Sequence, residues 1–126
     1  MFRAFLTIAA ILGGLSVASG AFASHALKDK LAERSLEIFE VAARYQMYHA
    51  LALLLVALLL RQAEMAQVWL TASGSAFIVG VLLFCGSLYA LSLSGIKILG
   101  AVAPLGGLAF IVGWVCLAIA AWELKQ

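Results

Sequence analysis

The residues of this chain best suited to chemistry are two histidines, His25 and His49, and the carboxylate of Glu40. Two imidazoles and a carboxylate can hold zinc and leave one coordination position open for water or a substrate. The two histidines, however, do not have the spacing of metal ligands on one helix, and a histidine near a membrane surface more often simply forms hydrogen bonds. A metal-binding or enzymatic site that uses His25 and His49 is therefore an alternative only, and no cofactor is expected.

A second group of polar residues forms the segment 44–49, Arg-Tyr-Gln-Met-Tyr-His, at the start of an apolar run that ends at Leu60. At 100° per residue its polar side chains occupy two separate arcs of a helix, one with Tyr45 and His49 and one with Arg44. A helix that is polar on most sides cannot face lipid there. We expect this part of the helix to lie among other helices, at the headgroup level or beside water.

Glu40 and Arg44 stand at positions i and i+4, with the carboxylate N-terminal, which is the favoured order for a helical ion pair. The uncharged part of this run is only about 24 Å long at 1.5 Å per residue, shorter than the roughly 30 Å hydrocarbon core. The helix is therefore expected to begin earlier and to include both residues. We predict a structural ion pair, because an interfacial arginine needs only a carboxylate and lipid phosphates as partners.

The composition shows which solvent surrounds these residues. Of the 126 residues, 66% are hydrophobic and 11% are charged, and the mean hydropathy is +1.13. A folded core of this size cannot hide so much apolar surface from water, so the remainder must face the lipid bilayer. The net charge is only +2 and the Lys and Arg residues are dispersed, which argues against a nucleic-acid partner.

Four long apolar runs predict an all-α integral membrane protein, a bundle of four transmembrane helices in a single domain over residues 1–126. The approximate spans are 3–24, 43–61, 67–93 and 99–122. The first run also contains Ala21-Phe22-Ala23, a small-x-small pattern typical of a signal-peptidase site, and cleavage there would leave three spans. We favour an uncleaved first helix, because the run is long for a signal peptide.

Residues 27–42 show helical amphipathicity between the first and second spans. Apolar residues such as Leu31 and Phe39 share one half of the helical wheel, and charged residues such as Glu33 and Arg34 share the other. We predict an amphipathic interfacial helix, with its apolar half toward acyl chains or toward the top of the bundle. Docking of a partner on this helix is the alternative.

The start of the fourth run carries residues that disturb helices. Pro104 is followed closely by Gly106 and Gly107, and this combination predicts a helix break, a kinked or locally unwound start. Elsewhere the apolar runs contain small residues at four-residue spacing, such as Ala109 and Gly113. This pattern favours close packing of helices.

Alternate threading of the spans places Arg3 and the loop at Arg61 on one side of the membrane, and the amphipathic helix and the loop at Lys97 on the other. The signal-like first run favours a cytoplasmic N-terminus, so we expect a multi-pass protein of the cell inner (plasma) membrane with both termini in the cytoplasm. Polar residues gather at the non-cytoplasmic end, beside Pro104. The predicted polar cluster, a candidate binding site, consists of His25, Tyr45, Gln46, His49, Ser87 and Tyr89.

Several of these segments together resemble a known family. They are Gly20-Ala21-Phe22 with His25-Ala26-Leu27, the segment 44–51 from Arg44 to Leu51, Gly86-Ser87-Leu88-Tyr89, and Ala103-Pro104-Leu105-Gly106-Gly107 with Gly113-Trp114. In this order they resemble the YgdD-like small membrane proteins, a domain-of-unknown-function family with bacterial and eukaryotic members. The resemblance covers all four spans and implies a four-helix membrane protein, without implying an activity.

Three classes of function fit these features. A structural or accessory membrane protein, working with a membrane protein partner or as a homo-oligomer, needs nothing beyond what the sequence contains, and we favour it. A small permease or channel component working as an oligomer is the alternative, although the cytoplasmic halves of the spans, such as 51–60, lack polar residues to line a path. The metal-binding or enzymatic site is the second alternative.

Overall fold

Long apolar helices determine the architecture, and the computed structural model describes residues 1–124. The elements in chain order are α1 (Phe2–Phe22), the π-helix η1 (Ala23–Leu27), α2 (Glu33–Gln62), α3 (Gln67–Gly80), the π-helix η2 (Val81–Cys85), α4 (Gly86–Ser94), the 3-10 helix η3 (Lys97–Ala101) and α5 (Ala103–Glu123). They combine into four helices long and apolar enough to cross a membrane: Phe2–Leu27, Glu33–Gln62, Gln67–Ser94 and Lys97–Glu123. The predicted all-α bundle of four spans is confirmed.

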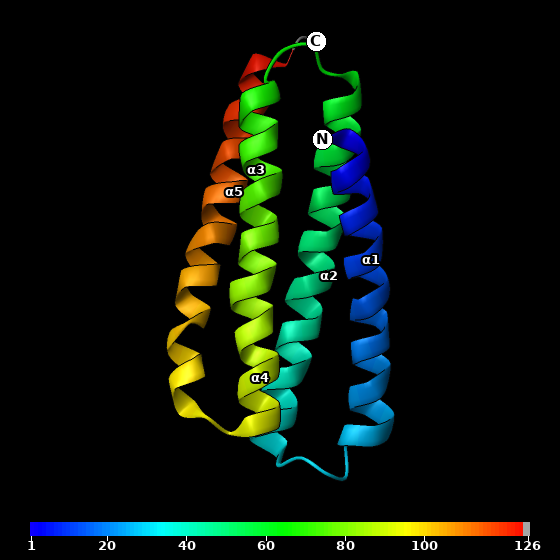
Figure 1. Cartoon of the computed structure of the whole chain (residues 1–126), viewed down its shortest axis with the longest axis vertical. Coiled ribbons are helices and arrows are strands. Elements are labelled where there is room, and N and C mark those ends of the chain that lie inside the picture. Colours follow the sequence, from blue (N-terminus) through cyan, green and yellow to red (C-terminus); the bar gives the residue numbers. More distant parts are fainter. Residues whose placement is uncertain (125–126) are drawn as a thin grey trace.

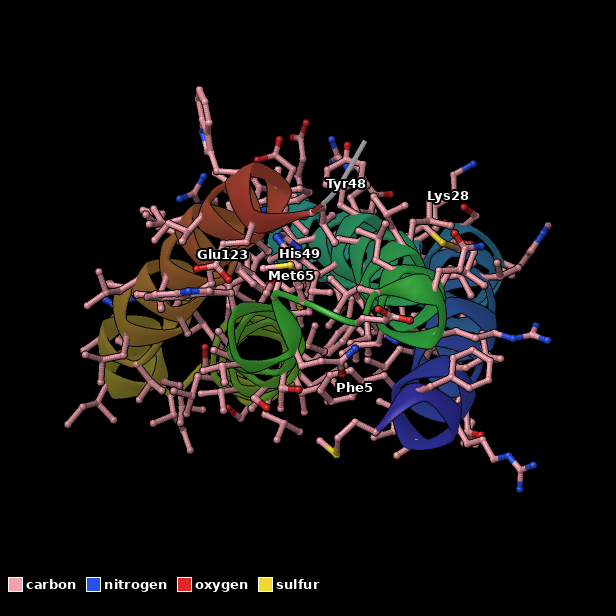
Figure 2. All side chains as sticks on the ribbon, turned by 90° about the horizontal axis from the view of Figure 1, so that it is seen from above. Phe5, Lys28, Tyr48, His49, Met65 and Glu123 are labelled. Carbon is pink, nitrogen blue, oxygen red and sulfur yellow. The ribbon has the colours of Figure 1, made fainter. Side chains whose placement is uncertain are left out.

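The four spans run alternately up and down, and the described ends of the chain lie at the same end of the bundle (Figure 1). Helix α1 packs mainly on α2, α2 packs on α3 and α4, and α3 packs on α5. The order of packing therefore places α1 at one edge of the bundle and α5 at the other, as the view from above also shows (Figure 2). Most of the outer face of α1 is left open.

The interior is packed by aromatic rings that fit against glycines. Figure 2 shows Phe5 pointing from α1 toward the centre of the bundle, where its ring fills the space that a side chain at Gly74 of α3 would need. A Cβ at Gly106 of α5 would overlap the backbone of Phe84 in η2. Close approach of α5 and the third span at this point therefore requires glycine, as expected for helices that pack without a hydrophobic driving force.

The separate amphipathic helix predicted over residues 27–42 does not form. The first span ends at Leu27, a turn follows, and α2 then continues from Glu33 to Gln62 without interruption. The reason is that no glycine or proline stands between Glu33 and the apolar run, so nothing stops the helix from propagating. At 1.5 Å per residue α2 is about 45 Å long, longer than the roughly 30 Å hydrocarbon core, and its charged first turns extend beyond that core.

The apolar face predicted for this segment does pack against the bundle. Phe39 is buried with Ala23 and Leu27 of the first span, and its ring meets Tyr89 of α4 edge-on, with centroids 4.9 Å apart. The charged first turns of α2 are therefore fixed to the bundle as part of a span.

The helix break predicted at Pro104, Gly106 and Gly107 is wrong for these three residues, which all lie in regular α5. Pro104 occupies the first turn, where a missing backbone N–H leaves no hydrogen bond unmade. The departure from α-helix comes one turn earlier, in the 3-10 helix η3. Gly106 instead allows α5 to pack closely against Phe84.

Candidate functional site

His49 is one of the polar residues that the spans bury. It lies about 24 Å along α2 from Glu33, in the middle of the bundle, where Figure 2 shows it between α2, α3 and α5. The sequence predicted a position near the non-cytoplasmic surface. His49 lies about 8 Å along α2 from Arg44, and its depth relative to the membrane surface stays a prediction.

The hydrogen bonds of His49 define its tautomer. Its Nδ1 lies 2.8 Å from the carbonyl oxygen of Tyr45, and its Nε2 lies 3.1 Å from the indole nitrogen of Trp114 in α5. An indole N–H can only donate, so Nε2 must accept, and the remaining proton on Nδ1 is donated to the Tyr45 carbonyl. His49 is thus a neutral imidazole whose two nitrogens are both satisfied.

Aromatic rings enclose the His49 imidazole. It stacks on Phe110 of α5 with ring centroids 3.5 Å apart and planes 8° from parallel. Phe77 of α3 lies 5.5 Å away, and Trp114 approaches edge-on at 5.9 Å. Three helices therefore contribute to one polar-aromatic cluster, which consists of His49, Phe77, Phe110 and Trp114.

Gln46 forms a second centre of hydrogen bonding, one turn before His49 on α2. Its Nε2 donates to the Leu12 carbonyl of α1 at 2.8 Å, and its Oε1 accepts from the Tyr89 hydroxyl of α4 at 2.7 Å. The amide group thus uses both of its ends, with its donor on a carbonyl and its acceptor on a hydroxyl. Gln46 links three elements of the bundle.

Two buried serines extend this set of bonds between helices. Ser16 of α1 donates to the Ala43 carbonyl of α2 at 2.6 Å, and Ser73 of α3 donates to the Gly113 carbonyl of α5 at 2.8 Å. Together with Gln46 and His49 they join all four spans. We call these interhelical hydrogen bonds the polar latches; their side chains are Ser16, Gln46, His49, Ser73, Tyr89 and Trp114.

The structure brings together only part of the predicted polar cluster. His25 is exposed in η1, far along the chain from the enclosed His49, and the two do not form one site. Ser87 donates to Phe84 of its own span at 3.0 Å. Tyr45 takes part through its backbone carbonyl, while its ring meets Phe84 with centroids 4.9 Å apart.

The metal site considered for His25 and His49 is not formed. Among residues 1–124, no three His, Cys, Asp or Glu side chains are grouped so that they could hold a metal ion. That alternative rested on the residue types, two imidazoles and a carboxylate. His49 is buried within α2, whereas His25 is exposed in the last turn of the first span.

The predicted ion pair between Glu40 and Arg44 is also absent from the part of the chain that the structure describes, where Arg34 and Glu37 form the ion pair at 3.8 Å. Arg44 is exposed and Glu40 is half-buried. An exposed pair gains little from Coulomb attraction and loses side-chain freedom, so helical spacing alone does not enforce it. Both residues instead line a groove between α1 and α2.

Sequence reasoning missed Trp114, Ser16 and Ser73 as hydrogen-bonding partners between the spans. The available signal was general: a hydroxyl or an indole N–H in an apolar span needs a hydrogen-bond partner. The partner of Trp114 could not be found this way, because 65 positions separate it from His49.

Four spans joined by buried polar side chains define a small polytopic membrane protein. The chain belongs to the family described as "Protein of unknown function (DUF423)", which matches residues 19–107. That match contains Gln46, His49 and Tyr89 and ends before Trp114.

Curated relatives are similar over nearly their whole length. The chain is 41% identical over 120 residues to the UPF0382 membrane protein YwdK of Bacillus subtilis, covering 94% of this chain and 96% of the relative. It is 40% identical over 118 residues to a UPF0382 membrane protein of Staphylococcus epidermidis, covering 94% of each. A UPF0382 membrane protein of Haemophilus influenzae is 38% identical over 123 residues, with 97% and 96% covered. No solved structure gives a significant match.

Proposed function

We propose that the protein is a structural or accessory membrane protein, in which the buried polar residues fix the arrangement of four spans and the outer surface meets its partners. The observation that carries this proposal is the set of polar latches. The interior side chains that could line a transport path, above all Gln46 and His49, are each hydrogen-bonded to neighbouring helices. Side chains used in this way stabilise the bundle and are not free to conduct a solute.

Each polar latch contributes a small free energy to the stability of the bundle, and the contributions add up. A hydrogen bond between membrane helices contributes on average about 0.6 kcal/mol, and up to about 1.7 kcal/mol in favourable cases. Latches at several levels therefore supply a few kcal/mol in lipid, where burial of apolar surface between helices contributes little. Their positions on different helix pairs also specify which helices are neighbours.

The surface available to a partner is largest on α1. Its outer face exposes Ile11, Leu15 and Phe22, and the helix itself packs mainly on α2. A second copy of this chain or another membrane protein would find here an apolar helix with small residues between the large ones. A photoreactive residue at Leu15 tests this face, and one at Leu108, exposed on α5, tests the opposite edge.

The location that we propose is the cell inner (plasma) membrane, with both termini in the cytoplasm. Arg3 at the start of the signal-like first span supports this orientation. The opposite side carries more Lys and Arg residues, but Asp29, Glu33, Glu37 and Glu40 balance those of the first loop and of the start of α2. The turn at 28–32 and the connection at 95–96 are then on the opposite side of the membrane.

Reconstitution into liposomes separates this proposal from a permease or channel. Wild-type protein and the His49→Leu variant are compared with empty liposomes for proton and small-cation flux, and the photoreactive variants are illuminated in native membranes. We expect flux equal to that of empty liposomes, and one discrete protein adduct from Leu15 or Leu108. A flux that is present in wild type and lost in His49→Leu would contradict the proposal, as would adducts with lipid alone at both positions.

A further inference from the structure

We propose that the groove between α1 and α2 at Glu40 and Arg44 binds a phospholipid whose headgroup carries both a phosphate and a primary ammonium, that is, an aminophospholipid. The groove has a volume of about 390 Å³. Its lining includes Val17, Gly20, Ser24, Glu40, Arg44 and Met47.

The two charged residues of the groove are not paired with each other. Within residues 1–124 the ion pair that forms on this helix is Arg34 with Glu37, one to two turns away from the groove. Glu40 and Arg44 have the spacing and order that would allow a helical pair, yet both side chains line the groove without one. They therefore present one positive and one negative group, side by side, to whatever occupies it.

The depth of the groove matches the headgroup boundary of a bilayer. From Arg61, at the opposite end of α2, the helix rises about 25 Å to Arg44, and the flexible arginine side chain adds several Å. On α1, Ser16 and Ser24 lie about 20 Å and 31 Å from Arg3. With a hydrocarbon core of roughly 30 Å, the groove runs from the upper acyl region to the level of the phosphates.

The chemistry of the lining fits a zwitterionic headgroup. The Arg44 guanidinium matches a phosphate, with two parallel N–H donors, and the Glu40 carboxylate matches an ammonium that can donate to it. Ser24 donates its hydroxyl proton to the Gly20 carbonyl at 3.1 Å, so its oxygen remains able to accept. Below these groups Val17 and Met47 offer apolar walls to the start of an acyl chain.

This arrangement distinguishes between headgroups. A net anionic headgroup such as phosphatidylglycerol would satisfy Arg44 and leave Glu40 facing negative charge. A choline headgroup would supply positive charge without an N–H donor for Glu40 or Ser24. Phosphatidylethanolamine supplies both the phosphate and the donor, so we expect it to be preferred.

Native mass spectrometry of the full chain, after delipidation and addition of equal amounts of the three lipids, measures this preference. We expect the wild type to retain phosphatidylethanolamine about tenfold over phosphatidylglycerol, the effect of one charge-assisted hydrogen bond. Arg44→Gln should lower the binding of both lipids, and Glu40→Gln should remove or reverse the preference. The matched controls are Arg34→Gln and Glu37→Gln, which remove charges of the same kind outside the groove. They should leave the preference for phosphatidylethanolamine unchanged.

Two glycine-to-leucine variants test the groove by adding a side chain without changing its charge. A Cβ at Gly20 or at Gly14 would meet no atom within 4 Å, so an added side chain begins in open space at either position. Gly20 lines the groove and Gly14 does not. Gly20→Leu should abolish selective retention of phosphatidylethanolamine while Gly14→Leu retains it. Equal retention of the three lipids by wild type, a preference for phosphatidylglycerol, or equal behaviour of the two leucine variants would overturn the proposal.

Discussion

His49 combines the chemistry of a functional histidine with the environment of a structural one. Its imidazole stacks on Phe110, and each ring nitrogen has a partner on a defined side. In this position the ring accepts the Trp114 N–H, a donor that would otherwise have no partner at the middle of the bundle. These contacts explain the residue by the stability of the bundle.

Two substitutions of His49 separate its hydrogen bonding from its size. His49→Gln keeps an acceptor that can reach the Trp114 N–H, so we expect a mild loss of stability. His49→Leu leaves that N–H unpaired among apolar groups and should lower the free energy of unfolding by about 1 kcal/mol or more. Thermal unfolding in one detergent compares both variants with wild type. A leucine variant as stable as wild type would show that the Trp114 N–H gains nothing from His49.

At the scale of single elements, hydropathy was sufficient to predict the four spans but not the residue at which the second span begins. The predicted second span began at residue 43, whereas α2 begins at Glu33. Charge patterning separates an interfacial surface from a buried one, but a helix ends only where glycine, proline or a turn stops it. The ten additional residues join the charged segment to the second span, so no separate interfacial helix forms.

Part of the candidate site was predictable from the positions of its residues along the spans. Gln46 and Tyr89 were expected to meet because both lie near the ends of spans on one side, and the structure has them hydrogen-bonded at 2.7 Å. The prediction that His25 joins this cluster was wrong, because a position near a helix end does not determine which way the side chain faces. The pairing of His49 with Trp114 depends on the rotation of α5 about its axis, which packing at glycines sets and hydropathy does not.

The fit of α5 against the third span is tested at Gly106. Gly106→Ala places a Cβ against the backbone of Phe84, which cannot move away as a flexible side chain could. We expect a loss of about 1–3 kcal/mol in the free energy of unfolding. Gly86→Ala is the matched control, because a Cβ there meets no atom within 4 Å. Equal effects of the two substitutions on unfolding would contradict the close approach of α5 and η2.

At the scale of the whole molecule, an even number of spans returns the chain to the side from which it started (Figure 1). Lys30 in the turn after η1 and Met65 in the turn after α2 are both exposed and lie at opposite ends of the bundle. Single cysteines at Lys30 and Met65, with Cys85 and Cys116 replaced by alanine, report the orientation. A membrane-impermeant maleimide applied to spheroplasts should label position 30 and spare position 65. Labelling at 65 with protection at 30 would reverse the proposed topology.

The role of the polar latches in holding the four spans together is tested most directly by the coupling between Gln46 and Tyr89. A double-mutant cycle with Gln46→Met and Tyr89→Phe measures the free energy of unfolding of the two single variants, the double variant and wild type in one lipid environment. We expect a favourable coupling energy of about 0.6–1.7 kcal/mol, the range of hydrogen bonds between membrane helices. Strictly additive effects of the two substitutions would contradict the claim that this bond stabilises the bundle.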